Sequence, residues 1–254
     1  THIIEPPNLW AERIDKKLRD MAPRVVAQSD GDWWYIGDLN TDSFGDTTKA
    51  GFRFDHMEEV TFAGRFKDVR PGAYIPKEFV ADLDHDGIYG AVIYPTAGLT
   101  VYSVPDSRLL TAICTAYNDW LSEFGQVVSG RLKGVALINL DIVKDAVDEL
   151  KRARKIGSDG AMITVFPPED RTYDRREYDP FWATAQDLDM PISLHINTNR
   201  AALGRKEYHI DLLKPSEYTI IDYFVRLSLS DMIFSGVFER FPNLMVGSVE
   251  HELG

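Results

Sequence analysis

From residue 77 onward, segments typical of strands and of helices alternate regularly along the chain. Short, almost wholly apolar runs are followed by longer segments whose apolar residues recur at helical spacing. Parallel strands need crossover connections, and strands buried on both faces are nearly continuous in apolar residues. The alternation therefore predicts an α/β fold around a parallel sheet, either a doubly wound open sheet or a (β/α)8 barrel.

The expected elements follow from these runs and from the residues that flank them. Strands are expected at 90–95, 132–140, 160–166, 191–197 and 244–250. Helices are expected at 77–86, 106–124, 141–156, 179–188 and 216–238, with Asp141 and Asp179 as N-caps and Gly87 and Gly157 at C-terminal ends. A sixth strand is expected at the N-terminus. A barrel has eight strands, so the last two would lie beyond Gly254.

Both ends of the sequence are expected to be cut, within a single barrel domain over residues 1–254. The sequence starts at Thr1 rather than at Met, directly before an apolar, strand-like stretch. It stops at Gly254, four residues after the last strand-like run. A terminal strand needs a further element to cover its edge, so we expect residues to be missing on both sides.

Residues 8–80 differ from the rest because Pro, Asp and Gly residues interrupt them repeatedly. One helix is expected at 8–19, and the segment as a whole is expected as an irregular excursion over the C-terminal mouth of the barrel. It contains the aromatic cluster Trp33, Trp34 and Tyr35, which either lines an aromatic substrate pocket or packs internally, and we favour packing. Because aromatic residues are enriched at subunit interfaces, we also expect this excursion to help form a homodimer.

Composition excludes several classes of protein. With 28 Lys and Arg against 40 Asp and Glu, the net charge is −12, and no basic excess is available to neutralise nucleic-acid phosphates. No apolar run approaches the ~18 residues of a membrane span, and Glu5-Pro6-Pro7 interrupts the apolar start before a secretory leader can form. The single Cys114 can form neither an internal disulfide nor a multi-thiolate zinc site, and its place on an apolar helix face predicts a core residue. A cytoplasmic location is expected.

The absence of G-x-G-x-x-G after any strand disfavours a dinucleotide-binding sheet, and the absence of G-x-x-x-x-G-K-[ST] excludes a P-loop.

His195 is the most informative of the six histidines. In P-I-S-L-H-I-N, strand alternation places Ser193, His195 and Asn197 on one face and the apolar residues on the other. In a barrel the apolar face meets the helices, so His195 would point inward near the C-terminal mouth, where barrel enzymes have their active sites. Neutral imidazole is a good ligand for zinc-type metals. From this strand alone, a metal ligand and a hydrogen-bonded core histidine are equally supported.

Two further places carry histidines near predicted strands. His2 stands in the first strand-like segment, where an incidental surface residue is the simpler interpretation when it is taken alone. Glu250 and His251 stand at the end of the last strand, where a proton-transfer group would be useful, although a solvated loop pair is the slightly favoured interpretation when they are taken alone. His56, His85 and His209 stand in polar segments and are expected at the surface.

Four stretches together resemble the amidohydrolase-related family of the amidohydrolase superfamily, in the branch that contains aminocarboxymuconate-semialdehyde decarboxylase and γ-resorcylate decarboxylase. The stretch T-H-I-I-E-P at 1–6 resembles the end of the motif D-x-D-x-H-x-x-E-P. I-Y-G-A-V-I-Y-P-T-A-G-L at 88–99, with A-Y-N-D-W at 116–120, is similar to the second-strand region. P-I-S-L-H-I at 191–196 matches the fifth-strand histidine motif, and residues 236–254 resemble the sixth-strand motif.

The resemblance implies a (β/α)8 barrel with one divalent metal ion, zinc as the first expectation and manganese as the second. His2 and His195 match the metal ligands of the first and fifth strands. His251, beside Glu250, falls close to the histidine that transfers a proton in the decarboxylases, although the glycine pattern around it differs. The eighth-strand aspartate of the family would lie beyond Gly254.

The resulting hypothesis is a metal-dependent enzyme that acts on a small organic carboxylic acid, aromatic or unsaturated, by hydrolysis or by non-oxidative decarboxylation. Arg53, Arg65 and Arg70 are candidates to neutralise the substrate carboxylate. The alternative hypothesis is a barrel without catalysis that serves as a binding or scaffold subunit, since fold does not fix function.

Overall fold

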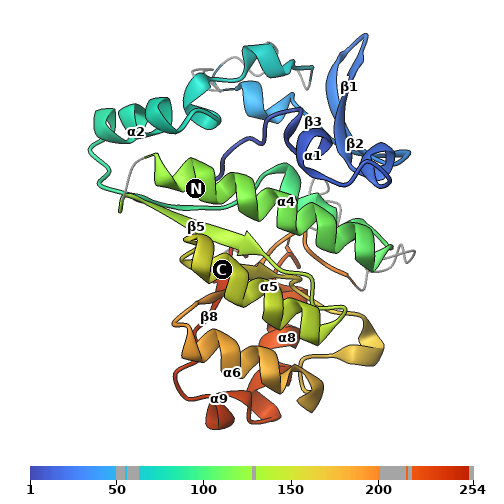
Figure 1. Cartoon of the computed structure of the whole chain (residues 1–254), viewed down its shortest axis with the longest axis vertical. Coiled ribbons are helices and arrows are strands. Elements are labelled where there is room, and N and C mark those ends of the chain that lie inside the picture. Colours follow the sequence, from blue (N-terminus) through green and yellow to red (C-terminus); the bar gives the residue numbers. More distant parts are fainter. Residues whose placement is uncertain (50–54, 56–62, 128–129, 201–215, 217–218, 252–254) are drawn as a thin grey trace.

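A parallel sheet of five strands forms the centre of the molecule (Figure 1). The computed structural model describes residues 1–49, 55, 63–127, 130–200, 216 and 219–251. The strands are β4 (Ala91–Ile93), β5 (Leu132–Leu137), β6 (Gly160–Ile163), β7 (Ile192–His195) and β8 (Val246–Val249). They lie side by side in chain order, and every neighbouring pair is parallel. All five strands expected after residue 77 are therefore present.

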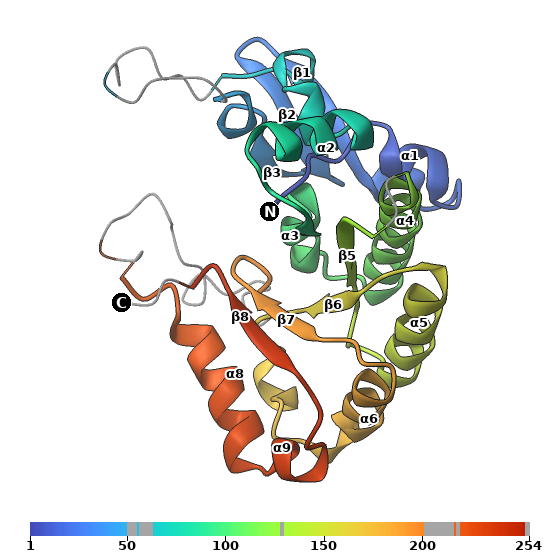
Figure 2. The same ribbon diagram turned by 90° about the vertical axis from the view of Figure 1, so that its left-hand side faces the viewer.

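Helices lie in every connection between consecutive strands, as parallel connections require, and most of them cover the outer face of this sheet (Figure 2). They are α3 (Ala97–Thr100), α4 (Ser107–Gln126), α5 (Val143–Ile156), α6 (Asp179–Asp187), α8 (Tyr223–Phe234) and α9 (Val237–Arg240). Asp106 is the N-cap of α4, where its carboxylate accepts from two backbone N–H groups. Gly157 ends α5 in the left-handed conformation, with φ 110°.

Some helix boundaries differ from the expectation. Asp141 does not cap α5: the helix starts at Val143, and the Asp141 carboxylate pairs with Arg200 instead. Asp179 is the first residue of α6 rather than its cap. The single helix expected at 216–238 is two helices, α8 and α9, separated by Gly236 with φ 74°.

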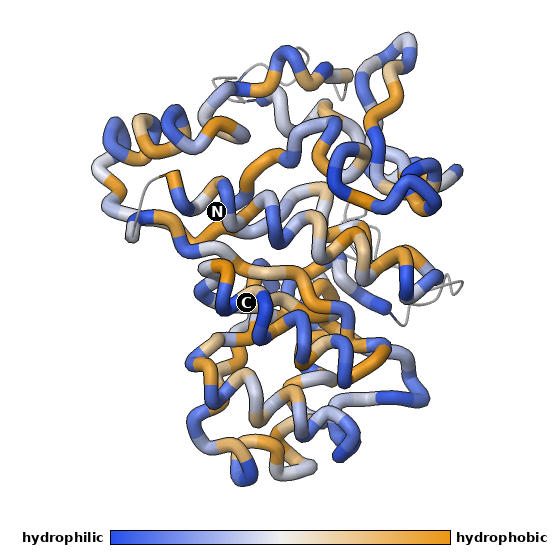
Figure 3. Tube along the Cα trace, viewed as in Figure 1, coloured by the Kyte–Doolittle hydropathy of each residue, from blue (hydrophilic) through white to orange (hydrophobic). Residues whose placement is uncertain are grey.

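The core has two parts, each a separate cluster of buried hydrophobic residues. Between the sheet and α5, α6 and α8, the outward side chains of β5, β6 and β7 pack against helix residues; Ala136, Ile138, Ile163, Ile192, Leu194, Leu150, Phe181, Trp182 and Val225 belong to this part. The second part joins α4 and the remaining strand residues to the N-terminal segment, with Cys114 buried in it as expected. Figure 3 shows hydrophobic residues along the strands and hydrophilic ones at the periphery.

Residues 8–80 are more regular than predicted. They begin with α1 (Leu9–Arg13) and contain an antiparallel sheet of β1 (Pro23–Gln28), β2 (Gly31–Ile36) and β3 (Leu39–Ser43), followed by α2 (Pro76–His85). Two-residue turns at 29–30 and 37–38 connect the strands. The Asp and Gly residues in and beside these turns, which suggested irregular chain, therefore belong to tight hairpins. The prediction of an irregular segment is therefore wrong for residues 23–43, and the helix expected at 8–19 ends at Arg13.

Trp34 is buried in the core shared by the two sheets. Its ring lies 5.4 Å from the ring of Trp10 and 5.6 Å from that of Phe44, measured between centroids. The internal packing that we favoured for this aromatic cluster is therefore correct for Trp34, whereas Trp33 and Tyr35 are half-buried on the same strand.

The N-terminal strand is reduced to a single parallel bridge between His2 and Tyr94. The Ile3 N–H donates to the Tyr94 carbonyl, and the Tyr94 N–H donates to the Thr1 carbonyl. The described residues thus form a curled, five-stranded parallel sheet with one bridged segment beside β4, which is half of a barrel. No helix among the described residues is long and apolar enough to cross a membrane.

Candidate metal centre

His195 is the last residue of β7, and its side chain is fully buried on the concave face of the sheet. Its Nδ1 lies 3.1 Å from the Ile196 carbonyl oxygen. A carbonyl oxygen only accepts, so Nδ1 carries the proton and Nε2 of the neutral ring carries a lone pair. Burial lowers the pKa of His195, and the neighbouring His2 lowers it further, which favours the neutral ring.

His2 reaches the same point from the other side of the concave face. Its Nδ1 lies 2.5 Å from the Pro95 carbonyl oxygen, so its Nε2 also carries the lone pair. The two Nε2 atoms are 3.3 Å apart, and the ring planes are nearly perpendicular at 84°. Two electron pairs that face each other at this distance repel unless a cation lies between them.

Glu250 adds a carboxylate to the two histidines. Its Oε1 lies 3.0 Å from Nε2 of His2, and its Oε2 lies 3.7 Å from Nε2 of His195. The residue follows β8 with φ 60°, a left-handed conformation that is uncommon outside glycine and clusters at functional sites. The ligand atoms of these three residues all lie within 4.8 Å of one another.

The donor set fits a divalent metal ion. Imidazole and carboxylate are ligands that zinc and other transition metals take. Metal-binding histidines usually donate their second ring N–H to a carbonyl or carboxylate, which is what the Nδ1 atoms of both histidines do here. The structure thus brings together His2 and His195, which were predicted as ligands, and adds Glu250, which was predicted as a catalytic group.

His251 lies beside this cluster but outside the set of three. The side chain is buried, and its Nδ1 is 3.0 Å from the Ser248 hydroxyl oxygen. Burial lowers the pKa of His251 to about 4, and the positive charge of a protonated His195 would lower it in the same direction. His251 is therefore neutral near pH 7, with Nδ1 turned toward Ser248.

Glu5 holds the segment that carries His2 in place. Its carboxylate is fully buried and accepts from the backbone N–H groups of Thr96, Ala97 and Gly98, at distances of 2.8–3.3 Å. These residues follow Pro95, whose carbonyl binds His2. From the sequence, Glu5 was expected only as part of the E-P motif. An acidic residue directly after the apolar pair Ile3-Ile4, three positions after a candidate ligand, was the available signal for this contact.

Burial raises the pKa of Glu5 to about 7, although the backbone donors oppose the shift. Because the pKa in the folded chain exceeds the ordinary value of 4.5, stability from this group is full below pH 4.5 and is lost as the pH rises to about 7 and above. We expect the free energy of unfolding of the native chain, relative to Glu5→Gln, to fall by about 3 kcal/mol between pH 4.5 and pH 8. Urea unfolding of both proteins measures the difference, and a constant difference over this range would refute the expectation.

Arg200 ties together the loops at the same end of the sheet. Its guanidinium pairs with Asp141 after β5 and donates to the carbonyls of Tyr102 and Val104 after β4. Its backbone N–H lies 3.0 Å from both the Phe166 carbonyl and the Thr164 hydroxyl after β6. Arg200 itself follows β7 and is 5% exposed, so one buried residue, through its side chain and its backbone, connects four consecutive loops.

The other predicted polar candidates lie elsewhere. Arg65 pairs with Asp32 of β2, and Arg70 pairs with Asp82 of α2. His85 is exposed at the end of α2. Arg53, His56 and His209 lie outside the described residues.

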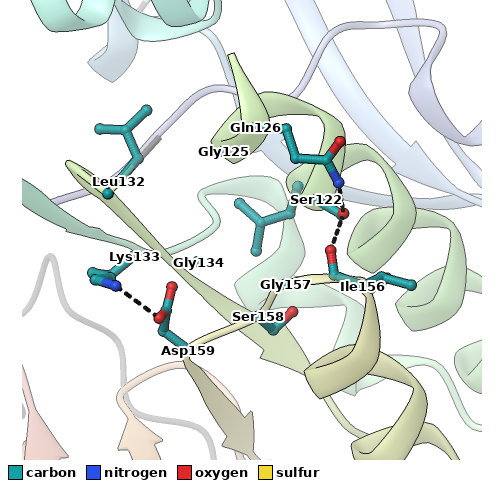
Figure 4. Close-up of a pocket in the computed structure, with 12 residues that line it drawn as sticks. Ser122, Gly125, Gln126, Leu132, Lys133, Gly134, Ile156, Gly157, Ser158 and Asp159 are labelled. Atoms are coloured by element: carbon teal, nitrogen blue, oxygen red, sulfur yellow. Dashed lines mark hydrogen bonds and ion pairs between the residues drawn. The ribbon is translucent and has the colours of Figure 1, made fainter. Parts of the chain in front are cut away.

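A separate pocket lies at the opposite end of the strands (Figure 4). It is lined by the last turns of α4 and α5 and by the first residues of β5, with the Lys133–Asp159 ion pair at 3.0 Å on one side. Since the strands are parallel, this pocket is at their N-terminal ends, whereas His195 and Glu250 stand at the C-terminal ends.

Comparison with known proteins gives consistent matches. A family model described as Amidohydrolase matches residues 95–246. A γ-resorcylate decarboxylase from Polaromonas sp. is 27% identical over 171 residues, which are 65% of this chain and 52% of that protein. The chain thus spans about half the length of that decarboxylase.

Two crystal structures extend the match to the fold. An amidohydrolase from Mycobacterium avium subsp. paratuberculosis K-10 is 21% identical with a TM-score of 0.77, and the match covers 99% of this chain and 71% of the other. A dihydroxybenzoic acid decarboxylase from Polaromonas sp., with bound manganese and the inhibitor 2-nitroresorcinol, is 25% identical with a TM-score of 0.56. That match covers 82% of this chain and 62% of the other.

Proposed function

The chain belongs to the amidohydrolase family, and from this we propose that it is a metal-dependent enzyme that decarboxylates a small aromatic carboxylic acid. The observation that carries the proposal is that the Nε2 atoms of His2 and His195 and the carboxylate of Glu250 lie close together at the C-terminal ends of the strands. Barrel enzymes have their active sites at this end. The similar decarboxylases support decarboxylation over hydrolysis, which was the other chemistry expected from the sequence.

We assign His2, His195 and Glu250 as the residues that hold one divalent ion. The manganese in the similar dihydroxybenzoic acid decarboxylase supports manganese, and the two imidazole donors are also compatible with zinc. When bound, such an ion supplies positive charge that binds an acidic substrate and stabilises developing negative charge.

His251 is the group that we assign to proton transfer. In a non-oxidative decarboxylation the bond between the ring carbon and the carboxyl carbon breaks, carbon dioxide leaves, and the ring carbon takes a proton. In this step the buried, neutral imidazole beside the three ligands accepts the proton that the substrate acid gives up and returns that proton to the ring carbon as carbon dioxide leaves, so that the acid yields only the ring compound and carbon dioxide. Ser248, through its contact with Nδ1, restricts the orientation of the ring.

For the fold, we propose that the curled sheet is part of an eight-stranded (β/α)8 barrel formed as a single domain. The amidohydrolase of Mycobacterium avium supports this, since nearly all of the chain matches that structure. The core shared by the N-terminal sheet, α4 and β5 supports one domain rather than two.

Metal analysis together with a decarboxylation assay tests the function. We expect about one manganese or zinc ion per chain, carbon dioxide release from a hydroxylated benzoic acid such as a dihydroxybenzoate, and loss of activity on chelation that added metal restores. Purified protein that neither contains nor binds either metal would contradict the proposal. A protein that binds metal but releases no carbon dioxide across a panel of hydroxylated benzoates would support the scaffold alternative.

The homodimer remains a prediction, and it now depends on fewer residues. Trp34 is buried in the internal core and is not available to a partner subunit. The half-buried Trp33 and Tyr35 of β2 remain as candidates for the interface. Light scattering at micromolar concentration is expected to give twice the mass of 28.8 kDa. A monomer at that concentration would contradict the prediction.

A further inference from the structure

Tyr94 contacts both candidate histidine ligands from the end of β4. Its backbone forms the only bridge that joins the His2 segment to the parallel sheet within the described residues. Its ring centroid lies 6.1 Å from that of His2 and 5.3 Å from that of His195. One aromatic ring therefore packs against both imidazoles.

The Tyr94 hydroxyl continues this contact to the strand of His195. It forms a hydrogen bond of 2.8 Å with the hydroxyl of Ser193, which is buried. Ser193 precedes His195 by two residues, so both side chains point to the concave face of β7. In the sheet order, β5 and β6 separate β4 from β7. The Tyr94–Ser193 hydrogen bond thus spans the concave face from the end of β4 to β7.

Each histidine needs more than one contact to keep its orientation. A hydrogen bond from Nδ1 to a carbonyl fixes which nitrogen carries the proton, but it leaves the ring free to tilt about that bond. The ring of Tyr94 restricts this tilt in both residues. The Tyr94–Ser193 hydrogen bond also restrains the separation of β4 and β7. Because His2 is bridged to Tyr94 and His195 belongs to β7, it restrains the separation of the two Nε2 atoms as well.

We propose that Tyr94, held by Ser193, is a positioning residue that sets the geometry of the His2–His195 pair. This inference rests on the proposed function, since the pair is assigned there as metal ligands. A tyrosine that only fills the core would affect stability alone. A positioning residue changes the environment of both imidazoles and the geometry of any ion that they hold.

The test compares Tyr94→Phe, Ser193→Ala and the double variant. Tyr89→Phe is the matched control, because Tyr89 precedes β4 and is 84% exposed. Long-range ¹H–¹⁵N spectra of the imidazoles are recorded on metal-free protein. Cobalt(II) absorption and manganese(II) affinity are then measured on the same variants, with urea unfolding to monitor stability.

We expect Tyr94→Phe and Ser193→Ala to shift the imidazole signals of both histidines, alter the cobalt absorption and weaken manganese binding about 2- to 10-fold. The double variant is expected to match either single variant, because one hydrogen bond is lost in all three. Tyr94→Leu, which also removes the ring, is expected to weaken binding about 10- to 100-fold.

Unchanged imidazole spectra in Tyr94→Phe, or equal changes in Tyr89→Phe, would overturn the inference. The metal-free spectra keep its outcome separate from that of the proposed function. If the native chain binds neither metal, the proposed function fails, while shifts of both histidines in Tyr94→Phe still support the positioning role.

Discussion

His195→Ala is expected to abolish tight metal binding and to remove decarboxylation with it. The substitution removes one of the two imidazole donors and, among the described residues, leaves the Glu250 carboxylate as the remaining candidate ligand beside Nε2 of His2. Changes to groups that merely support a metal ligand already cost about 10- to 100-fold in affinity, so we expect a loss of at least about 100-fold here. Isothermal titration with manganese and with zinc measures the loss, and urea unfolding verifies that the variant remains folded.

Two further variants sharpen this result. His85→Ala removes an exposed histidine of α2 and is expected to leave metal affinity unchanged. His251→Ala is expected to keep the metal but to lower kcat about 10²- to 10⁴-fold, because a proton-transfer group acts in the transition state. If His195→Ala keeps full metal affinity, the assignment of His2, His195 and Glu250 as the metal ligands is wrong. Loss of metal in His251→Ala would make His251 a ligand instead.

Among the ion pairs of the described residues, the pair of Arg200 with Asp141 is expected to show the largest loss of stability when its cation is removed by Arg200→Met. The substitution leaves the largely buried Asp141 carboxylate without its partner and two loop carbonyls without their donor. Removing one partner of a buried ion pair costs about 3–5 kcal/mol. At about 2–4 °C per kcal/mol for a chain of this size, the melting temperature should fall by roughly 6–20 °C.

The control for this prediction is Arg176→Met, which removes an exposed guanidinium that lies 3.4 Å from Asp179, while Asp179 keeps its pair with Arg240. Exposed pairs contribute less than about 1 kcal/mol, so little change is expected there. The double variant Arg200→Met, Asp141→Leu should recover part of the loss, because it removes the uncompensated charge. A loss for Arg200→Met no larger than for Arg176→Met would show that the loops are held together by other contacts.

The parallel half of the fold was predictable because its central strands, β5 to β7, are buried almost throughout. Continuous apolar runs such as those of β6 and β7 have few alternatives, and the glycine after α5 marks its end. The hairpins of β1–β3 were missed because their strands show neither a continuous apolar run nor a regular polar–apolar alternation, and the connecting Asp and Gly residues also suit irregular chain. Local sequence alone does not distinguish a hairpin of this kind from irregular chain, because the pairing with the neighbouring strand decides between them.

The candidate site was partly predictable for the same reason. Strand alternation placed His195 inward, and the motif order placed His2 opposite to it. The position of the Glu250 carboxylate depends on a left-handed backbone after β8, which no pattern in V-G-S-V-E-H indicates. The pairing of Asp141 with Arg200 joins residues 59 positions apart, so the local signal of a helix cap prevailed in the prediction.

The single bridge at Tyr94 has a consequence for how the chain folds. His2 meets His195 across 193 positions and Glu250 across 248, so the three donors come together only when nearly the whole chain is closed. Contacts of such long range form late, after the entropy of the intervening loops has been lost. An ion that binds only this closed state adds about 2.7 kcal/mol of stability at 100 times its dissociation constant. During refolding, metal uptake should therefore follow the last cooperative step and report the docking of the first residues.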